Sequence, residues 1–310
     1  MADVFALETD NMTKAFGRLA AVESLNLRVR VGSIHGFVGP NGSGKTTTMK
    51  MLVGALTPDS GTGVVKGHRI GSKEARRLIG YCPEHPAAYA DMTALDYLIY
   101  MARLSGLDGK QAGIKAVETL NGVDLDPFSN ATTGKFSAGM KQRLGLAQAI
   151  VHAPEVLVLD EPTANLDPGG RMWLVEKLRH LVKDGKTTIL ISSHILPELE
   201  QFIDALTLIH QGKLMAQDSM DALRAGAVRN RYVVETPDGD AVMAALRSKP
   251  RIRDIWLDAA GAVHIVSEDR AALHKEILGI VQAGMAVRSF GEEDQSLEEL
   301  YRKVIGGGPG

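Results

Sequence analysis

The sequence predicts an α/β protein with a parallel sheet at its centre, followed by a small second domain of mixed α+β type. Short apolar runs at residues 34–38, 156–160 and 187–192 have the composition of buried strands. Segments with an apolar period near 3.6 lie between them, as expected for helices that cover a parallel sheet. Because the composition shifts at residues 224–230, we place one domain at residues 1–225 and the other at residues 226–310.

The overall composition excludes several classes of protein. Of the 310 residues 45% are hydrophobic, enough for a core, and the formal net charge of −2 gives no sign of a nucleic-acid-binding surface. The single cysteine, Cys82, excludes an internal disulfide framework and suits a reducing cytoplasm. The N-terminus lacks the features of a signal peptide, and no apolar run approaches the ~20 residues that cross a bilayer. A membrane part, if there is one, must therefore come from another chain.

The strongest local signal is a glycine-rich loop at residues 39–46. A buried strand precedes the loop and a helix follows it, which is the setting that the pattern G-x-x-x-x-G-K-[ST] requires. Backbone N–H groups of such a loop surround a polyphosphate, Lys45 would reach the outer phosphates, and the Thr46 hydroxyl would bind Mg²⁺. In this setting the alternative, a glycine-rich turn with an exposed lysine, is disfavoured. We therefore expect a nucleoside triphosphate to be bound by Gly39, Pro40, Asn41, Gly42, Ser43, Gly44, Lys45, Thr46 and Thr47.

Before this loop, residues 1–33 indicate antiparallel β structure. Strands are expected at residues 4–7 and 25–31, and in the second of these Leu25, Leu27 and Val29 alternate with polar residues. Phe16 lies at the turn between the two strands. Taken alone, an aromatic residue at a hairpin end is more often part of the core than a partner for a nucleotide base.

A helical subdomain is predicted at about residues 88–150, inserted into the alternating β/α chain. Thr93 is a candidate N-cap for its first helix. A second helix is expected to present Ile114, Val117 and Leu120 as its apolar positions.

A third helix of this subdomain begins near Ser137. Ser137 stands at the N-cap position, with Ala138 and Gly139 in the first turn. A helix N-terminus with small residues and a hydroxyl is a second candidate anion site, although most capping serines only cap.

Polar residues follow two of the buried strands at their carboxyl ends. Asp160 and Glu161 end one strand, and His194 follows another. Ligands of such sheets bind at this edge, so Asp160 is a candidate Mg²⁺ ligand opposite Thr46, and Glu161 a candidate base for an attacking water. A lone histidine is usually structural, but here a γ-phosphate contact is favoured for His194.

The second domain is predicted to be a ferredoxin-like module. Strands are expected at residues 232–235, 252–257, 263–266 and 285–289, with helices at 240–247 and 271–282. A last helix would carry Leu297, Leu300, Tyr301 and Val304, ahead of a flexible glycine-rich tail. Because no catalytic cluster is evident here, an interaction or regulatory role is expected.

Taken together, these motifs resemble the nucleotide-binding subunit of an ATP-binding cassette (ABC) transporter over residues 4 to about 222. Walker A is residues 39–46, Walker B is residues 156–160 with Glu161, and the signature is residues 136–140. The D-loop is residues 165–167, ending in Asp167, and the switch histidine is His194. In this resemblance Phe16 matches the aromatic residue that stacks on adenine.

Two positions depart from the usual family pattern. The signature commonly reads Leu-Ser-Gly-Gly-Gln, but here Ala138 and Met140 replace a glycine and the glutamine. The Q-loop residue is Glu84 where the family normally has glutamine; this carboxylate can still bind Mg²⁺ but adds negative charge near the γ-phosphate. Both departures resemble the ABC-2 type exporters, which include drug and antibiotic-resistance pumps and exporters of lipids or polysaccharides. The C-terminal module is similar to the extension that many of these carry.

The resemblance implies an ATPase fold with a P-loop core, ATP and Mg²⁺ as ligands, and a head-to-tail dimer of two cassettes. Residues 39–46 of one chain would face Ser137, Ala138 and Gly139 of the other. The resemblance assigns Lys45 to binding of the β- and γ-phosphates and Glu161 to the role of general base. It assigns His194 to a contact with the γ-phosphate and Asp167 to the link between the two sites. The residues assigned to Mg²⁺ binding are Thr46, Glu84 and Asp160.

The implied partners are a separate ABC-2 type membrane permease and a second cassette, identical or similar. The chain would then lie on the cytoplasmic face of the cell membrane, with a groove near residues 84–89 that receives a coupling helix. The alternative is a soluble cassette ATPase that acts on ribosomes or DNA. Such proteins commonly carry two cassettes, long coiled-coil insertions or zinc-binding cysteines, none of which this sequence contains.

Overall fold

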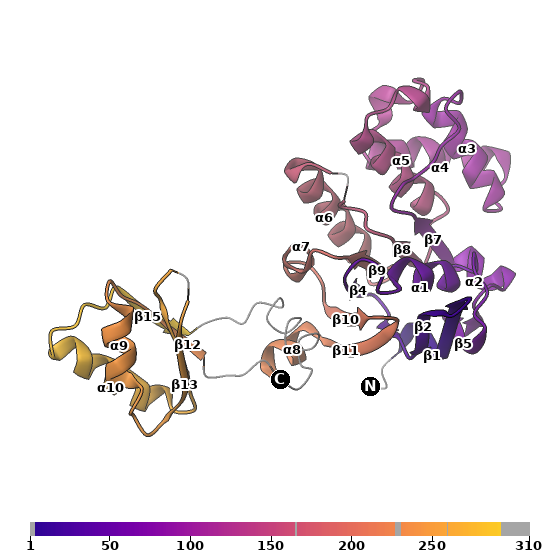
Figure 1. The fold of residues 1–310 in the computed structure, drawn as a ribbon. Helices are drawn as coiled ribbons and strands as arrows, with labels where there is room; N and C mark the ends of the chain where they lie inside the picture. Colours follow the sequence, from indigo (N-terminus) through magenta and orange to yellow (C-terminus); the bar gives the residue numbers. More distant parts are fainter. Residues whose placement is uncertain (1–3, 165, 227–230, 259, 293–310) are drawn as a thin grey trace. The chain divides into compact units, whose positions relative to one another are not determined.

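The structure is a computed structural model that describes residues 4–164, 166–226, 231–258 and 260–292. The described residues divide into two compact units, one within residues 4–220 and the other within residues 221–292. Figure 1 traces the chain through both units. Among these residues, no helix is long and apolar enough to cross a membrane.

A six-stranded sheet forms the centre of the first unit. Its strands are β4 (Ile34–Val38), β7 (Ile79–Cys82), β8 (Val156–Leu159), β9 (Thr188–Ser193), β10 (Ala205–His210) and β11 (Lys213–Ser219). They are arranged in the order β11-β10-β4-β9-β8-β7, and β11 is antiparallel to β10 while the other neighbours pair in parallel. β4 and β8 are buried along their whole length, which explains their continuous apolar sequence. The carboxyl ends of β4, β8 and β9 therefore meet at one edge of the sheet.

A second, antiparallel sheet contains the N-terminal residues. Its strands are β1 (Phe5–Phe16), β2 (Leu19–Leu25), β3 (Arg28–Arg30), β5 (Ser60–Val65) and β6 (His68–Arg69). The expected strand at residues 4–7 continues to Phe16, and the expected strand at 25–31 is interrupted. The interruption follows from local chemistry: Ser24 has a left-handed φ of 47°, and the Asn26 side chain bonds to Ser24 O and to the N–H of Asn11.

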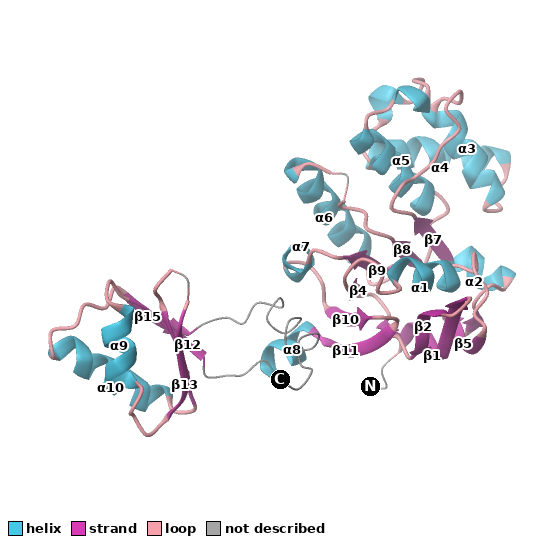
Figure 2. Cartoon of the chain, in the orientation of Figure 1, coloured by secondary structure: helices cyan, strands magenta, loops and turns pink. Residues whose placement is uncertain are grey.

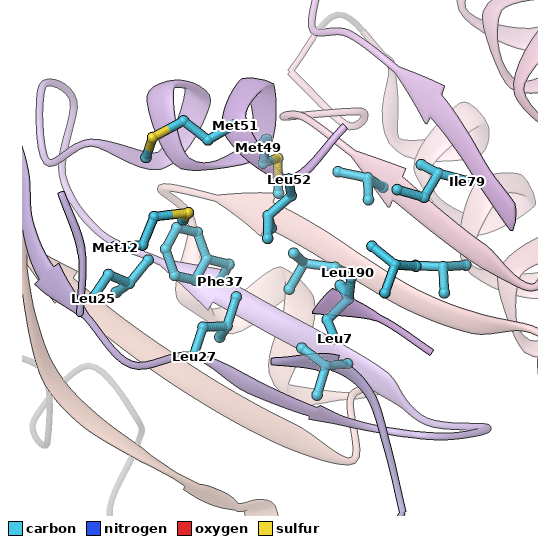
Figure 3. Close-up of a cluster of buried hydrophobic side chains, with 14 of the residues drawn as sticks. Leu7, Met12, Leu25, Leu27, Phe37, Met49, Met51, Leu52, Ile79 and Leu190 are labelled. Carbon is cyan, nitrogen blue, oxygen red and sulfur yellow. The ribbon is translucent and has the colours of Figure 1, made fainter. Parts of the chain in front are cut away.

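The main core lies between these two sheets, where α1 (Lys45–Leu52) packs. Figure 3 shows Met49 and Leu52 of α1 near Phe37 of β4, with Leu25 and Leu27 from the antiparallel side. All five side chains are fully buried. Each such side chain contributes about 1.5–3 kcal/mol of hydrophobic stabilisation. The glycine-rich loop is thus anchored at both ends, by a central strand and by a helix in the core.

Three helices form a separate group in the first unit, as Figure 2 shows. They are α3 (Ala94–Leu104), α4 (Gly109–Gly122) and α5 (Ala138–Ile150), with short 3-10 helices η1 (Asp126–Phe128) and η2 (Thr133–Lys135) between α4 and α5. Thr93 caps α3 as predicted, because its hydroxyl accepts the N–H of Asp96 at 3.1 Å.

The apolar face predicted for α4 is wrong at two of three positions. Ile114 and Val117 are 50% and 57% exposed, whereas Ala112, Ala116 and Leu120 are buried. Alanine lets neighbouring helices approach closely, so the buried stripe is carried by small side chains that hydrophobicity alone did not single out.

Several helices of the first unit differ from the sequence prediction. α2 (Lys73–Leu78) and α7 (Leu196–Glu200) were not predicted, since six and five residues are too few to show a 3.6-residue period. The sequence predicts a strand at residues 78–81, but Leu78 ends α2 and the strand begins at Ile79. The sequence predicts a helix at residues 171–182, and α6 (Pro168–Val182) begins three residues earlier, because Asp167 caps it and Pro168 occupies its first turn. A further helix, α8 (Met220–Gly226), begins at the last residue of the first unit and continues into the residues of the second.

The second unit has one sheet with helices packed on it. Its elements are β12 (Arg231–Glu235), α9 (Gly239–Leu246), β13 (Ile252–Leu257), β14 (Val263–Ser267), α10 (Arg270–Gln282) and β15 (Ser289–Glu292). The sheet has the order β13-β14-β12-β15, with every neighbouring pair antiparallel. Residues from both helices and from β12 and β14 share one buried cluster, so this unit has its own hydrophobic core.

The last strand of this unit begins four residues later than predicted. Gly284 adopts a left-handed φ of 94°, and the N–H of Met285 bonds to Ile280 O at 3.1 Å. This pattern ends α10 as a Schellman motif and holds Met285 at the helix end, so the strand cannot start there. The predicted helix with Leu297, Leu300, Tyr301 and Val304 lies outside the described residues, as does Asn165.

Candidate functional site

The glycine-rich loop connects β4 to α1, and its backbone requires glycine. A side chain at Gly39 would clash with the carbonyl of Ile209, and one at Gly44, where φ is 105°, would clash with the carbonyl of Ala21. Gly42, with φ of 80°, has nothing within 4 Å of the place where a Cβ would lie. The loop is therefore fixed against the protein on one side and open on the other.

The open side borders a cavity of about 960 Å³. The predicted site residues that line it are Phe16, Asn41, Gly42, Gly44, Lys45, Thr46, Thr47, Glu84, Glu161 and His194. Gln211 and Lys213 also line it and were not predicted. The cavity thus brings together the loop, the end of β8, the end of β9 and the N-terminal hairpin.

Lys45 is the buried cation of this site. Its side chain is 6% exposed, and its Nζ donates to Gly39 O at 2.7 Å and to Pro40 O at 3.3 Å. The same Nζ lies 3.2 Å from Glu161 Oε1, so a lysine–carboxylate ion pair joins the start of α1 to the end of β8. A buried charge without such partners would be costly.

Glu161 has an unusual backbone that aims it at Lys45. It follows β8 with a left-handed φ of 47° and is 6% exposed. Its N–H donates to Ser192 Oγ at 2.8 Å, and Ser192 Oγ in turn donates to Asp160 Oδ1 at 2.8 Å. Ser192 thus positions both acids. Sequence reasoning missed it, although the signal was present: it lies at the end of the strand next to β8.

His194 completes the cluster on the other side of Glu161. Its Nδ1 lies 2.8 Å from Glu161 Oε2, and its backbone N–H donates to the same oxygen at 3.3 Å. The Glu161 carboxylate therefore has a cation at one oxygen and an imidazole at the other. Such a carboxylate, held at the wall of an open cavity, can orient a water molecule and accept its proton.

The candidate Mg²⁺ ligands do not form a self-contained metal centre. Thr46 and Glu84 line the cavity, while Asp160 is 1% exposed and bonded to Ser192. Within the described part of the chain there is no group of three or more His, Cys, Asp or Glu side chains that could hold a metal. Their hard oxygen atoms fit Mg²⁺, which is usually bound by one or two carboxylates together with substrate phosphates.

Phe16 is at the edge of the cavity, not in the core. Its side chain is 51% exposed, and Lys14 Nζ lies 5.8 Å from its ring centroid. The core interpretation, favoured for Phe16 taken alone, is therefore wrong. An exposed ring bordering the phosphate loop's cavity offers a flat apolar face to a ligand.

The predicted second anion site is separate from this cavity. Ser137 is exposed and caps α5, with its hydroxyl accepting the N–H of Met140 at 3.3 Å. Asp167, also exposed, caps α6 by accepting the N–H of Gly170 at 2.9 Å. Ser137, Ala138, Gly139 and Asp167 do not line the cavity. Within one chain, the structure does not bring them to the loop.

Cys82, the last residue of β7, is buried and its thiol is unreactive. Burial, with a further contribution from the charge of Asp160, raises the pKa of its thiol to about 12. A thiol with so high a pKa is a poor nucleophile at neutral pH. This site therefore has no cysteine chemistry.

Comparisons with known proteins agree with this geometry. The sequence model of the family described as ABC transporter matches residues 22–164. The bacitracin transport ATP-binding protein BcrA of Bacillus licheniformis is 38% identical over 308 residues, which span 97% of this chain and 98% of that protein. The daunorubicin resistance ATP-binding protein DrrA2 of Streptomyces coeruleorubidus is 32% identical, over 98% of this chain and 96% of that protein.

A solved structure has the same fold. The structure of an ATP-binding subunit of an ABC transporter superimposes with a TM-score of 0.65 at 27% identity, covering 71% of this chain and 92% of that one. Full-length similarity to ATP-binding proteins, a shared fold and a complete phosphate loop lead to one conclusion: the chain belongs to the ABC transporter family, as an ATP-binding subunit with ATPase activity.

Proposed function

We propose that this chain is the ATP-hydrolysing subunit of an ABC-2 type exporter and drives transport through a separate membrane permease. The observation that carries the ATPase part is the cluster of Lys45, Glu161 and His194 on the wall of the phosphate-loop cavity. Similarity along the whole chain to proteins named for bacitracin transport and daunorubicin resistance supports a drug or antibiotic as cargo. Lipids and polysaccharides are the other cargo classes of this exporter group.

In the proposed mechanism, the chain's own residues hold ATP and activate water. Lys45, now bonded to loop carbonyls, turns to the β- and γ-phosphates, and the loop N–H groups surround them. Phe16 stacks on the adenine. Glu161 accepts the proton of the attacking water, while His194 orients that carboxylate and contacts the γ-phosphate. Thr46, Asp160 and Glu84 would hold Mg²⁺, which neutralises phosphate charge when bound.

The proposed catalytic unit is a head-to-tail dimer. Ser137 and Asp167 are exposed and lie away from the cavity of their own chain, which supports a role against a second chain. Residues 137–139 of one cassette would then close over the ATP held by residues 39–46 of the other. ATP binding would close the dimer, and hydrolysis would reopen it.

Glu161→Gln tests the catalytic assignment. We expect turnover, measured as phosphate release, to fall by about 10²–10⁴, because the amide cannot accept the proton. ATP binding should persist, and the variant should form a stable dimer in analytical ultracentrifugation with ATP. The control is Glu176→Gln, an exposed glutamate of α6 outside the cavity. Wild-type turnover in Glu161→Gln would exclude Glu161 as the base.

Purification of the tagged chain from detergent-solubilised membranes tests the transport assignment. The expected result is one polytopic membrane protein in stoichiometric amount, with the chain on the cytoplasmic face of the membrane as a peripheral subunit. Recovery of ribosomal proteins or nucleic acid without a membrane protein would instead support a soluble cassette ATPase and overturn the exporter proposal.

For the second domain, residues 226–310, we propose a ferredoxin-like fold and an accessory or regulatory role. The strand–helix order and the sheet order β13-β14-β12-β15 support this fold class. Its role is tested by deleting residues 226–310: basal ATP hydrolysis should remain, while ATPase stimulation by the permease should change. Loss of ATP binding in the deleted chain would contradict an accessory role.

A further inference from the structure

A tryptophan on α6 lies at the centre of a polar cluster that the proposed catalytic cycle does not use. Trp173 Nε1 donates to Asp124 Oδ2 at 2.5 Å, and the guanidinium carbon of Arg143 lies 4.3 Å from the centroid of the Trp173 ring. Lys177 Nζ lies 5.8 Å from the same ring centroid. We call Asp124, Arg143, Trp173 and Lys177 the Trp173 cluster.

Asp124 links the members of this cluster. Its carboxylate lies 3.5 Å from Arg143 Nη1 and 3.4 Å from Lys177 Nζ. Its left-handed φ of 58° belongs to the end of α4, where the Leu125 N–H donates to Leu120 O at 2.9 Å in a Schellman motif. Two cations and a ring N–H therefore share one carboxylate. Hydrogen bonds to a charged group are stronger than those between neutral groups.

The Trp173 cluster links the helical group to α6 in the first unit. Asp124 lies two residues after the end of α4, and Arg143 lies in α5, so both belong to the helical group. Trp173 and Lys177 lie in α6, which packs on β9 of the parallel sheet. The same seam holds a cavity of about 780 Å³ between Thr119 of α4 and Leu181 of α6. Apolar packing does not fill the seam there. The C-terminal part of α5 is held closely on β7, where a Cβ at Gly80 would clash with Ala149 O, and the Trp173 cluster links α5 to α6 nearer to the N-terminus of α5.

The positions of the cluster residues relate it to the proposed dimer surface. Arg143 lies six residues from Ser137, the N-cap of α5, and Trp173 lies six residues from Asp167, the N-cap of α6. In both helices this corresponds to about 9 Å along the axis. A small rotation of α5 about Arg143 would therefore displace Ser137 relative to Asp167.

We propose that the Trp173 cluster is a positioning device that fixes α5 against α6 and so sets the spacing of Ser137 and Asp167 for ATP-dependent dimerisation. The inference rests on the proposed head-to-tail dimer. The residues of the Trp173 cluster touch neither the phosphate loop nor its cavity of about 960 Å³. They therefore act through α5 and α6 on the surface that meets the second chain.

The test uses the full-length chain with Glu161→Gln, in which ATP-bound dimers should accumulate. Trp173→Phe removes the Nε1–H donor and keeps a ring for the two cations. We expect the chain concentration needed for half-dimerisation with ATP to rise about tenfold, in line with the loss of one charge-assisted hydrogen bond. The affinity of the monomer for ATP, measured with a fluorescent analogue at low chain concentration, should not change.

Two further variants separate positioning from general stability. Met172→Ala, at a neighbouring position of α6 that is 75% exposed, should dimerise like the parent chain. Asp124→Asn keeps an acceptor for Trp173 and a side chain that tolerates the left-handed φ, but removes the charge. Combined with Trp173→Phe, its effect should be clearly less than additive, because both changes weaken the same bond.

The outcomes are distinguishable. If the Glu161→Gln parent binds ATP but does not dimerise, the head-to-tail proposal fails and the positioning role fails with it. If the parent dimerises and Trp173→Phe dimerises equally well, only the positioning role is overturned. A Trp173→Phe chain that loses monomer affinity for ATP in proportion would indicate general destabilisation and would likewise overturn it.

Discussion

Two helix N-termini in the first unit, those of α1 and α5, show how differently one chain can prepare a site for phosphate. α1 begins after Gly44, which has no side chain to cap the helix, so its first N–H groups remain available to a ligand. α5 begins after Ser137, whose hydroxyl already accepts the N–H of Met140. Lys45 and Glu161 beside the first N-terminus are buried, whereas Ser137 is exposed. The first N-terminus belongs to a nearly complete phosphate site, formed by residues 39–46 with Glu161, which we call the cradle. The second is an exposed surface that needs a ligand brought by another chain.

The largest effect should come from breaking the cradle. Lys45→Ala removes the buried cation, and we expect the affinity for ATP to fall by at least about a hundredfold, since two or more charged hydrogen bonds to phosphate are lost. Turnover should be undetectable. Calorimetric titration with ATP measures this, with Lys50→Ala on the exposed side of α1 as the control. Near-normal affinity in Lys45→Ala would mean that phosphate binds elsewhere.

An intermediate effect is expected at the exposed N-terminus. Ala138→Asp places a carboxylate in the first turn of α5, where the helix dipole tolerates it, so folding should be preserved. The same charge would repel the phosphates of a second chain's ATP. We expect turnover to fall about a hundredfold while the ATP affinity of the monomer is unchanged. If monomer affinity fell instead, Ala138 would contact nucleotide within its own chain, and the contrast between the two N-termini would disappear.

The smallest effect should come from Phe16, at the rim of the cradle. Phe16→Ala removes one stacking surface, which is worth about 1–3 kcal/mol for a base on an aromatic side chain. ATP affinity should therefore fall by roughly tenfold, with Phe16→Tyr close to wild type and the melting temperature nearly unchanged, because the ring is half exposed. A lower melting temperature with unchanged affinity would show that Phe16 is a packing residue after all.

Much of the cradle could be predicted from the sequence, because its residues either lie close together in the sequence or follow the carboxyl ends of parallel strands. The loop was found from its glycine spacing, and Glu161 and His194 were found because parallel strands end at one edge. The pairing of Lys45 with Glu161 was not predicted, because Lys45 begins α1 and β9 lies between β4 and β8 in the sheet. The left-handed backbone of Glu161 and the linking role of Ser192 could not be read in this way, since both depend on the register between β8 and β9.

Other features lacked a local signal. α2 and α7 are too short for a periodic pattern, and the buried face of α4 is carried by alanines that hydrophobicity alone undervalues. The Trp173 cluster brings together residues 124, 143 and 173, which are far apart in sequence and individually unremarkable. Such contacts follow from how helices pack, and one sequence gives no indication of them.

The central claim is that each site is completed by a second chain, and mixing two inactive variants tests it most directly. Lys45→Ala lacks the lysine of the phosphate site but keeps the N-terminus of α5 intact. Ala138→Asp keeps the phosphate site intact but carries a carboxylate at the N-terminus of α5. In a mixed head-to-tail dimer, one site would combine the two intact halves. We predict that ATP turnover, negligible for each variant alone, recovers on mixing to about one quarter of wild type, since about half of the dimers are mixed and each holds one complete site. Turnover that stays at the level of the separate variants would contradict the shared site.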